Sequence, residues 1–255
     1  MVRGIDLFRD HFADFTDYFT LIGGAACELT LTGTIGFRAT KDIDILVLLE
    51  KVDRDFAEQF HRFITAGNYS CYISKDENRH FYRFLTSGAN DYPPQIELLS
   101  RTLFPEYPDM KYTPLAEDSY VKSMSAIILG TEYYNYAQTH RVMQRGLPCL
   151  DTDALIVFKS AAYLNLREQR EKDPKSVRSE EITKHRNDVF RLLTTVIQGQ
   201  AAEVPEIIKV NLQRFINSFP ANDAQWQAIR QSLGAIADTP ENYLRVFNSH
   251  FQLEQ

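Results

Sequence analysis

Two patterns of hydrophobic and polar positions follow one another along the chain, and the first covers about a hundred residues. Short apolar runs, typical of buried strands, lie at 18–22, 43–49, 69–73 and 81–85. Helical patterns lie between them at 25–31 and 56–64, and Gly67-Asn68 supplies the stop signal for the second helix. That helix has an apolar face formed by Phe56, Phe60, Phe63 and Ile64. The alternation predicts a mixed α/β unit.

From Asp151 onward the pattern is almost entirely helical. Asp151-Thr152-Asp153 provides caps for a first helix, which the turn-forming segment 172–175 closes. A second helix begins near Ser179, and Thr239-Pro240 begins the last one. The remaining helices are marked by apolar stripes at helical spacing: Ile208, Leu212, Phe215 and Ile216; Trp226, Ile229, Leu233 and Ile236; Leu244, Phe247 and Phe251.

The two patterns predict an α+β chain with two parts. Residues 1–150 are expected to form a mixed sheet with flanking helices, and residues 151–255 a helical bundle. Pro105 and Pro108 predict an irregular connection over 103–111. A chain of 255 residues is long enough for each part to bury its own core.

Composition excludes several classes of protein. With 44% hydrophobic and 24% charged residues, the chain is globular rather than disordered. No apolar run approaches the roughly 18–20 residues that span a bilayer, so we expect no membrane insertion. Three widely spaced cysteines in apolar surroundings favour buried thiols in a reducing cytoplasm. A net charge of -6 indicates no general nucleic-acid surface, so any RNA contact must be local.

The segment from Leu21 to Leu49 carries the strongest chemical signal. A short apolar run ends at Gly23-Gly24, where a bare backbone entering a helix can present N–H groups to a phosphate. Asp42 and Asp44 then stand two apart on a strand, so both carboxylates point to the same face. Two carboxylates on one face suit magnesium, which prefers oxygen ligands and completes its shell with phosphate oxygens.

Glu97 is the candidate for a third acidic ligand. It lies in the strand-like segment 95–99, just after Pro93-Pro94, and a neighbouring strand would bring it beside the aspartates. The competing interpretation of the Asp-x-Asp pair is a solvated strand end. The glycine turn, the preceding Arg38 and Thr40, and the apolar strand that follows favour a site instead. Arg38 also fits an ordinary surface charge.

A second set of candidates lies on the helices after Asp151. Lys159 falls on the apolar face of the first helix, where it is either a side chain that snorkels to solvent or a ligand for phosphate. Lys184 and Asp188 are four apart on the second helix, which fits either a surface ion pair or functional roles. His185 lies on an apolar face, where a hydrogen-bonded core histidine is the commoner case.

The stretch GGAACELTLTGTIGFRATKDIDILV resembles the G-G/S…R-x-T-x-D-h-D-h-h signature of the nucleotidyltransferase superfamily, in which h is apolar. The chain is more closely similar to the AbiEii-like branch, named for the toxin half of abortive-infection toxin–antitoxin systems. That branch has a helical K-x-x-A segment and a later K/R-x-x-D helix, which FKSAAYL and KHRNDVFRLL resemble. The resemblance extends from Leu21 to Leu193.

The resemblance implies a nucleotidyltransferase-type sheet, with the helical domain completing the active-site cleft, and a role for each matching residue. Gly23 and Gly24 would bind the phosphates of the nucleotide, and Arg38, Thr40 and Lys184 are further candidates for nucleotide binding. Asp42 and Asp44 would hold Mg2+, and Glu97, assigned from its strand rather than from the resemblance, would be the third acidic ligand. Lys159 and Asp188 would act with these carboxylates in catalysis. The turn reads Gly-Gly-Ala where many members have Gly-Ser, so backbone N–H groups would replace a hydroxyl.

These observations predict a magnesium-dependent transfer of a nucleoside monophosphate from an NTP to an acceptor, with release of pyrophosphate. RNA or protein is the expected acceptor, and the toxin-like relatives imply an antitoxin partner. Glu97 or Asp188 would take the acceptor's proton, and Lys159 would stabilise the leaving pyrophosphate. Two alternatives stay open: a nucleotidyltransferase acting on a small molecule such as an antibiotic, and a non-catalytic relative that binds nucleotide or a partner.

Overall fold

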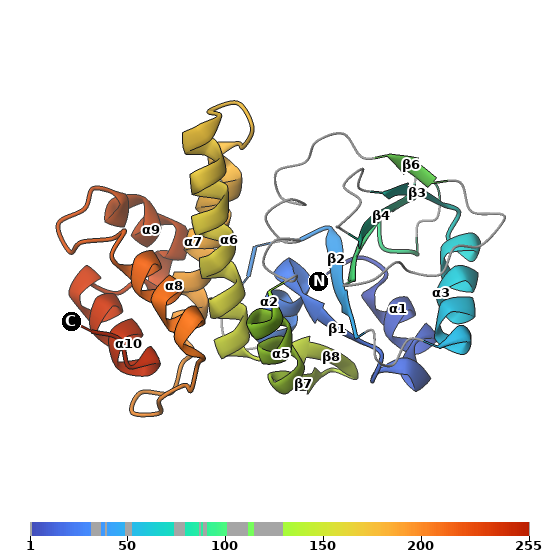
Figure 1. Ribbon diagram of the computed structural model, residues 1–255, viewed down its shortest axis with the longest axis horizontal. Coiled ribbons are helices and arrows are strands. Elements are labelled where there is room, and N and C mark those ends of the chain that lie inside the picture. Colours follow the sequence, from blue (N-terminus) through green and yellow to red (C-terminus); the bar gives the residue numbers. More distant parts are fainter. Residues whose placement is uncertain are drawn as a thin grey trace. The chain divides into compact units, whose positions relative to one another are not determined.

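The computed structural model describes residues 2–31, 37–38, 40–48, 53–73, 80–86, 88, 91–100, 112–114 and 130–254. The expected α+β architecture, a mixed sheet followed by helices, is confirmed (Figure 1). The chain divides into two compact units. The sheet unit comprises Met1–Val121 and Gln138–Asp151, and the helical unit comprises Lys122–Ala137 and Thr152–Gln255. The predicted irregular connection over 103–111 lies outside the described residues.

The described strands form one mixed sheet of eight strands in the order β6-β3-β4-β5-β2-β1-β8-β7. In its centre, β2 is antiparallel to β1 and parallel to β5, and β5 is antiparallel to β4. β1 is also parallel to β8. The strands are β1 (Phe19–Ile22), β2 (Asp42–Val47), β3 (Tyr69–Ile73), β4 (His80–Thr86), β5 (Gln95–Ser100), β6 (Tyr112–Pro114), β7 (Arg141–Gln144) and β8 (Leu147–Leu150).

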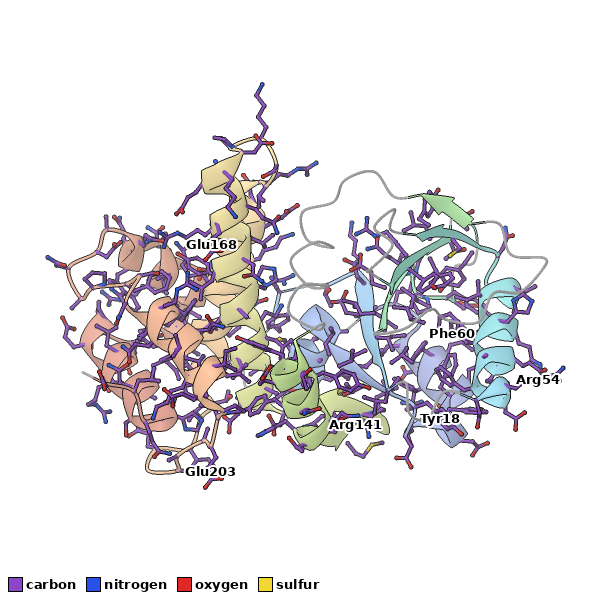
Figure 2. All side chains as sticks on the ribbon, viewed as in Figure 1. Tyr18, Arg54, Phe60, Arg141, Glu168 and Glu203 are labelled. Atoms are coloured by element: carbon purple, nitrogen blue, oxygen red, sulfur yellow. The ribbon has the colours of Figure 1, made fainter. Side chains whose placement is uncertain are left out.

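An aromatic core covers one face of this sheet. Helices α1 (Ile5–His11) and α3 (Arg54–Ala66) supply Phe8 and Phe63, whose ring centroids are 5.5 Å apart. Phe60 points from α3 toward the sheet and meets Phe84 of β4 at 5.3 Å, whereas Arg54 points into solvent (Figure 2). Full burial of each such ring contributes about 1.5–3 kcal/mol to the stability of the fold. This face of the sheet is therefore covered by the hydrophobic core.

Helix α3 begins where its sequence predicts. The Asp53 carboxylate accepts a hydrogen bond from the Phe56 N–H and another from the Tyr18 hydroxyl, which lowers the pKa of Asp53. A short 3-10 helix (Ala13–Phe15) leads from α1 toward β1. Helix α2 (Gly23–Leu31) follows β1 directly and packs against β2 and β8.

The hairpin of β7 and β8 was not predicted from the sequence. Its turn residues Arg145 and Gly146 both have positive φ, at 52° and 81°, as a tight two-residue hairpin requires. The Arg141 guanidinium donates to the carbonyls of Thr16 and Phe19 at 2.6 and 2.9 Å, which ties the hairpin to the residues before β1 and to the strand itself.

The helical unit is built on aromatic packing. Phe190 of α7 contacts Phe215, Trp226 and Tyr243, which come from the three helices that follow α7. Among the described helices, none is long and apolar enough to cross a membrane. The helices are α5 (Thr131–Thr139, shared with the sheet unit), α6 (Thr152–Lys172), α7 (Ser179–Leu193), α8 (Glu206–Ile216), α9 (Gln225–Leu233), a 3-10 turn (Gly234–Ile236) and α10 (Pro240–Phe251).

Candidate active site

A row of charged side chains crosses the face of the sheet opposite the aromatic core. Residues directly opposite each other on neighbouring strands point to the same face. Asp44 of β2 is opposite Glu97 of β5, and Glu97 is opposite Arg83 of β4. Asp42, two residues before Asp44 on β2, shares this face. The register therefore brings the predicted acidic residues of two strands to one place.

Glu97 is held firmly by its neighbours. Its Oε1 atom accepts from Nε and Nη2 of Arg83, both at 2.8 Å, and from the Gln95 amide at 2.7 Å. Its Oε2 atom accepts no hydrogen bond within the described part of the chain, although the side chain is only 2% exposed. One oxygen of Glu97 is held by the N–H groups of Arg83 and Gln95, and the other is a buried acceptor that can still bind a donor or a cation.

Asp44, which is opposite Glu97, is also buried, with 5% of its surface exposed. Two buried carboxylates therefore lie side by side. Burial raises the pKa of Glu97 well above its usual range, the Asp44 carboxylate raises it further, and the Arg83 guanidinium opposes both effects. Adjacent buried carboxylates are costly unless a cation or a shared proton neutralises them. The site is therefore electrostatically suited to a bound cation.

The glycine turn presses against the same carboxylate. Gly23 has φ of 67°, and a Cβ atom at this position would lie 1.8 Å from Oδ2 of Asp44. A Cβ atom on Gly24 would lie 2.7 Å from Oγ1 of Thr40. Only glycine permits these approaches, so the chain enters α2 with its backbone directly beside Asp44 and Thr40. Backbone N–H groups at a helix start bind anions such as phosphate.

The acidic residues fit magnesium that is shared with a phosphate ligand. Over the described residues, no group of three or more His, Cys, Asp or Glu side chains is close enough together to hold a metal ion by itself. Magnesium needs no such cage, because it commonly binds through one or two carboxylates plus phosphate oxygens and water. Asp44 with the remaining oxygen of Glu97 meets this requirement, and Asp42 lies on the same face.

In the helical unit, Lys159 and Asp188 form a buried ion pair. Nζ of Lys159 on α6 lies 2.8 Å from Oδ2 of Asp188 on α7, and their side chains are 5% and 2% exposed. Lys159 therefore does not snorkel to solvent. Asp188 thus pairs with a lysine of the neighbouring helix. Lys184, four residues before Asp188 on α7, is exposed.

Two further candidates from the sequence are partly or fully buried. The Arg38 guanidinium is half-buried and stacks 5.2 Å from the Phe37 ring centroid. His185 is 7% exposed on the packed face of α7. Arg83 was missed by sequence reasoning, although a single cation in the apolar strand segment HFYRFLT was an available signal.

Comparison with known proteins adds one distant likeness. No protein-family model matches the chain, and no curated protein matches it. Among solved structures, the chain is similar to the antibiotic-resistance factor ANT(2'')-Ia, whose solution structure is described as revealing substrate-regulated conformation dynamics. The match has 12% sequence identity and a TM-score of 0.33, and it covers 72% of this chain and 83% of that one. A TM-score this low does not establish a common fold, so the function is inferred from the residues of this chain.

Proposed function

We propose that the protein is a magnesium-dependent nucleotidyltransferase that moves a nucleoside monophosphate from an NTP to an acceptor and releases pyrophosphate. The observation that carries the proposal is the contact between the Gly23 turn and Asp44, at the place where Asp44 lies beside Glu97. A phosphate-binding backbone turn next to two buried carboxylates is the combination that a metal-bound triphosphate requires.

Each residue of this site has a physical task in the proposal. Backbone N–H groups at Gly23 and Gly24, with the Thr40 hydroxyl beside them, bind phosphate oxygens. Asp42, Asp44 and Glu97 hold magnesium, which when bound neutralises triphosphate charge and polarises the α-phosphorus. The Arg83 fork fixes the Glu97 carboxylate, so its second oxygen stays directed at the metal site.

The proposal also assigns tasks to the charged residues of the helices. Lys159 stabilises charge on the pyrophosphate, and its pairing with Asp188 fixes the ammonium group in one position. Glu97 or Asp188 accepts the proton of the attacking group. Half-buried Arg38 and exposed Lys184 supply further positive charge for the nucleotide phosphates.

The resemblance to the AbiEii-like branch is the ground for proposing an acceptor and a partner. On that basis we propose RNA or protein as the acceptor and a toxin role with an antitoxin partner. A small-molecule acceptor such as a cationic antibiotic is the alternative among enzymes, because an acidic protein attracts cations.

Transfer of label from an NTP tests the proposal and identifies the acceptor class. Purified protein is incubated with magnesium and each α-phosphate-labelled NTP, in separate reactions with cellular RNA, cellular protein and cationic antibiotics. The Asp44→Asn variant removes one carboxylate, and Asp10→Asn, an exposed aspartate of α1, is the matched control. We expect label in one acceptor class with the wild type and with Asp10→Asn, and none with Asp44→Asn. Absence of label from every acceptor would contradict the proposal.

A further inference from the structure

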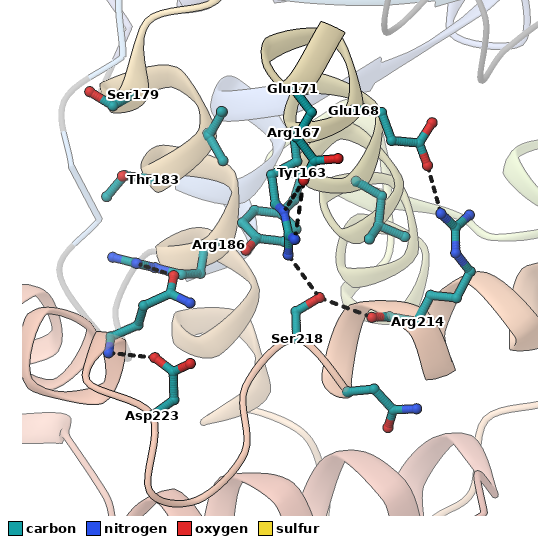
Figure 3. Close-up of a pocket in the computed structure, with 14 residues that line it drawn as sticks. Tyr163, Arg167, Glu168, Glu171, Ser179, Thr183, Arg186, Arg214, Ser218 and Asp223 are labelled. Carbon is teal, nitrogen blue, oxygen red and sulfur yellow. Dashed lines mark hydrogen bonds and ion pairs between the residues drawn. The ribbon is translucent and has the colours of Figure 1, made fainter. Parts of the chain in front are cut away.

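A cavity of about 770 Å³ lies within the helical unit. Its walls come from the second half of α6, the first half of α7, the end of α8 and the turn before α9 (Figure 3). None of the residues assigned to nucleotidyl transfer lines it. The volume falls within the roughly 300–1,000 Å³ typical of small-molecule sites.

Arg186 is the buried charge of this cavity. It is 7% exposed, and its guanidinium donates to Oδ1 of Asn187 and Oε1 of Gln225, both at 3.0 Å. Burial lowers the pKa of Arg186, whereas Tyr163 and Asp223 raise it. A guanidinium nevertheless stays protonated at neutral pH. The side chain therefore carries a full positive charge among neutral hydrogen-bond partners.

The other two arginines of the cavity each have a carboxylate partner. Arg214 donates to Glu168 at 2.6 Å, and Arg167 donates to Glu171 at 3.3 Å and to the Ser218 hydroxyl at 3.2 Å (Figure 3). The Asp223 carboxylate accepts from the Gln225 N–H at 2.7 Å, and it acts on Arg186 through its charge without forming an ion pair with it among the described residues.

Of the three arginines in the wall, Arg186 is therefore the one without a carboxylate partner among the described residues. A buried charge is costly when nothing neutralises it, so an anion from outside the chain would fill this need.

The start of α7 presents further donors to the same space. Ser179, Thr183 and Arg186 lie at i, i+4 and i+7, so they share one face of the helix, and all three line the cavity. The positive end of the helix dipole adds to their attraction for an anion. Ile182 is half-buried and provides apolar surface beside these donors, whereas Tyr163 and Leu164 line the cavity as buried side chains.

We propose that this cavity binds a small-molecule phosphate monoester. Its phosphate group is bound by the Arg186 guanidinium with the hydroxyls of Thr183 and Ser179, and its organic part packs on Ile182. A phosphate is favoured over a carboxylate because its three free oxygens match a guanidinium and two hydroxyls arranged along one helix face. The site is separate from the proposed active site, so it does not depend on the protein being a nucleotidyltransferase.

Calorimetric titration of the full chain tests this site, with inorganic phosphate, glucose 6-phosphate, uridine 5′-monophosphate and acetate as probes. The variant Arg186→Gln removes the charge but keeps hydrogen-bonding capacity. Its matched control is Arg245→Gln, an exposed arginine of α10 whose hydrogen bonds go to Asn242 on the same helix. Circular dichroism verifies that each variant is folded, and Thr183→Val supplies a second, less buried substitution.

We expect wild type and Arg245→Gln to bind phosphate and at least one monoester, with affinity roughly tenfold lower in Arg186→Gln and a smaller loss in Thr183→Val. Comparison of the sugar phosphate with the nucleotide tells which organic part the cavity prefers. Three results would overturn the proposal: no binding of phosphate or either monoester up to about 10 mM, equal binding by folded Arg186→Gln and Thr183→Val, or acetate binding as tightly as phosphate.

Discussion

At the scale of single residues, Gly23 connects the backbone to the proposed chemistry. A Cβ atom there would collide with Asp44 Oδ2, and φ is 67°. We expect Gly23→Ala to lower the free energy of unfolding by about 1–3 kcal/mol and to abolish nucleotidyl transfer, because Asp44 must move. Gly234→Ala is the matched control, since Gly234 has φ of 61° with no atom within 4 Å of the added Cβ. Urea denaturation and the label-transfer assay measure both variants, and equal effects would contradict the account.

The three cysteines are predicted to be chemically inert in the native protein. Cys27, Cys71 and Cys149 are buried thiols, and burial raises the pKa of Cys71 and Cys149 to about 12. Because thiolate is the reactive form, an aromatic disulfide reagent at about pH 8 should label none of them before unfolding. All three should react in denaturant. Rapid labelling of one thiol in the native state would contradict the burial of these three side chains.

At the scale of elements, variants of the ion pair between α6 and α7 distinguish a structural role of the pair from a catalytic one. Lys159→Met removes the buried ammonium group that pairs with the Asp188 carboxylate and should cost about 3–5 kcal/mol of stability. The double variant Lys159→Met with Asp188→Leu should recover most of this stability. Denaturation of both variants measures the effect, and a loss under about 1 kcal/mol in the single variant would show that the pair is solvated.

In the proposal this double variant, although stable, lacks nucleotidyl transfer, because both charged groups are gone. Label transfer by the restored double variant at the wild-type rate would show that the pair is only structural.

A second contact between elements makes stability depend on pH. His250 of α10 lies 2.7 Å from both the Asp153 carboxylate of α6 and the Gln200 carbonyl. Burial lowers the pKa of His250, but these two partners outweigh it and raise the pKa above the ordinary value of 6.5. The contribution to stability is then complete below pH 6.5 and is lost as the pH rises through the folded-state pKa.

Melting temperatures measured between about pH 5.5 and 9 test this linkage. Wild type should be more stable than His250→Gln at the acidic end, and the difference should shrink as the pH rises. Asp153→Asn should show the same loss of pH dependence. A difference that grows with pH would have the wrong sign for the contact.

Two elements show how much of the fold could be predicted from the sequence. Helix α3 was predictable because its apolar stripe, the Asp53 cap and the Gly67-Asn68 stop all agree. The β7 and β8 hairpin was missed because its strands are short and its turn is Arg145-Gly146 rather than a common Asn-Gly pair. Local propensity gives little information for such an element.

The candidate site could be anticipated only in part. Asp42 and Asp44 are two apart on one strand, so spacing alone places them on one face, whereas the glycine turn reaches Asp44 through the pairing of β1 with β2. The fork from Arg83 to Glu97 depends on the pairing of β4 with β5, and register is a property of the folded sheet. For the same reason, spacing along α7 suggested Lys184 for Asp188, whereas helix packing supplies Lys159.

At the scale of the whole molecule, the chain has a net charge of -6 and two compact units with different candidate sites. The sheet unit buries Asp44 beside Glu97, a surplus of negative charge suited to a metal ion. The helical unit buries Arg186 among neutral partners, a positive charge suited to an anion. Opposite local charges within one acidic chain show that net charge does not predict what each unit binds.

The most direct test of the account is whether the sheet unit's carboxylates bind a nucleotide through a divalent ion. A non-hydrolysable NTP analogue is titrated calorimetrically into the full chain with magnesium and again with a chelator, for wild type, Asp44→Asn and the control Asp10→Asn. We predict binding that requires magnesium in wild type and Asp10→Asn and that is at least tenfold weaker in Asp44→Asn, on the order of 1.4 kcal/mol or more. Binding that is unchanged by the chelator and by Asp44→Asn, or no binding by the wild type, would contradict the assignment of this site.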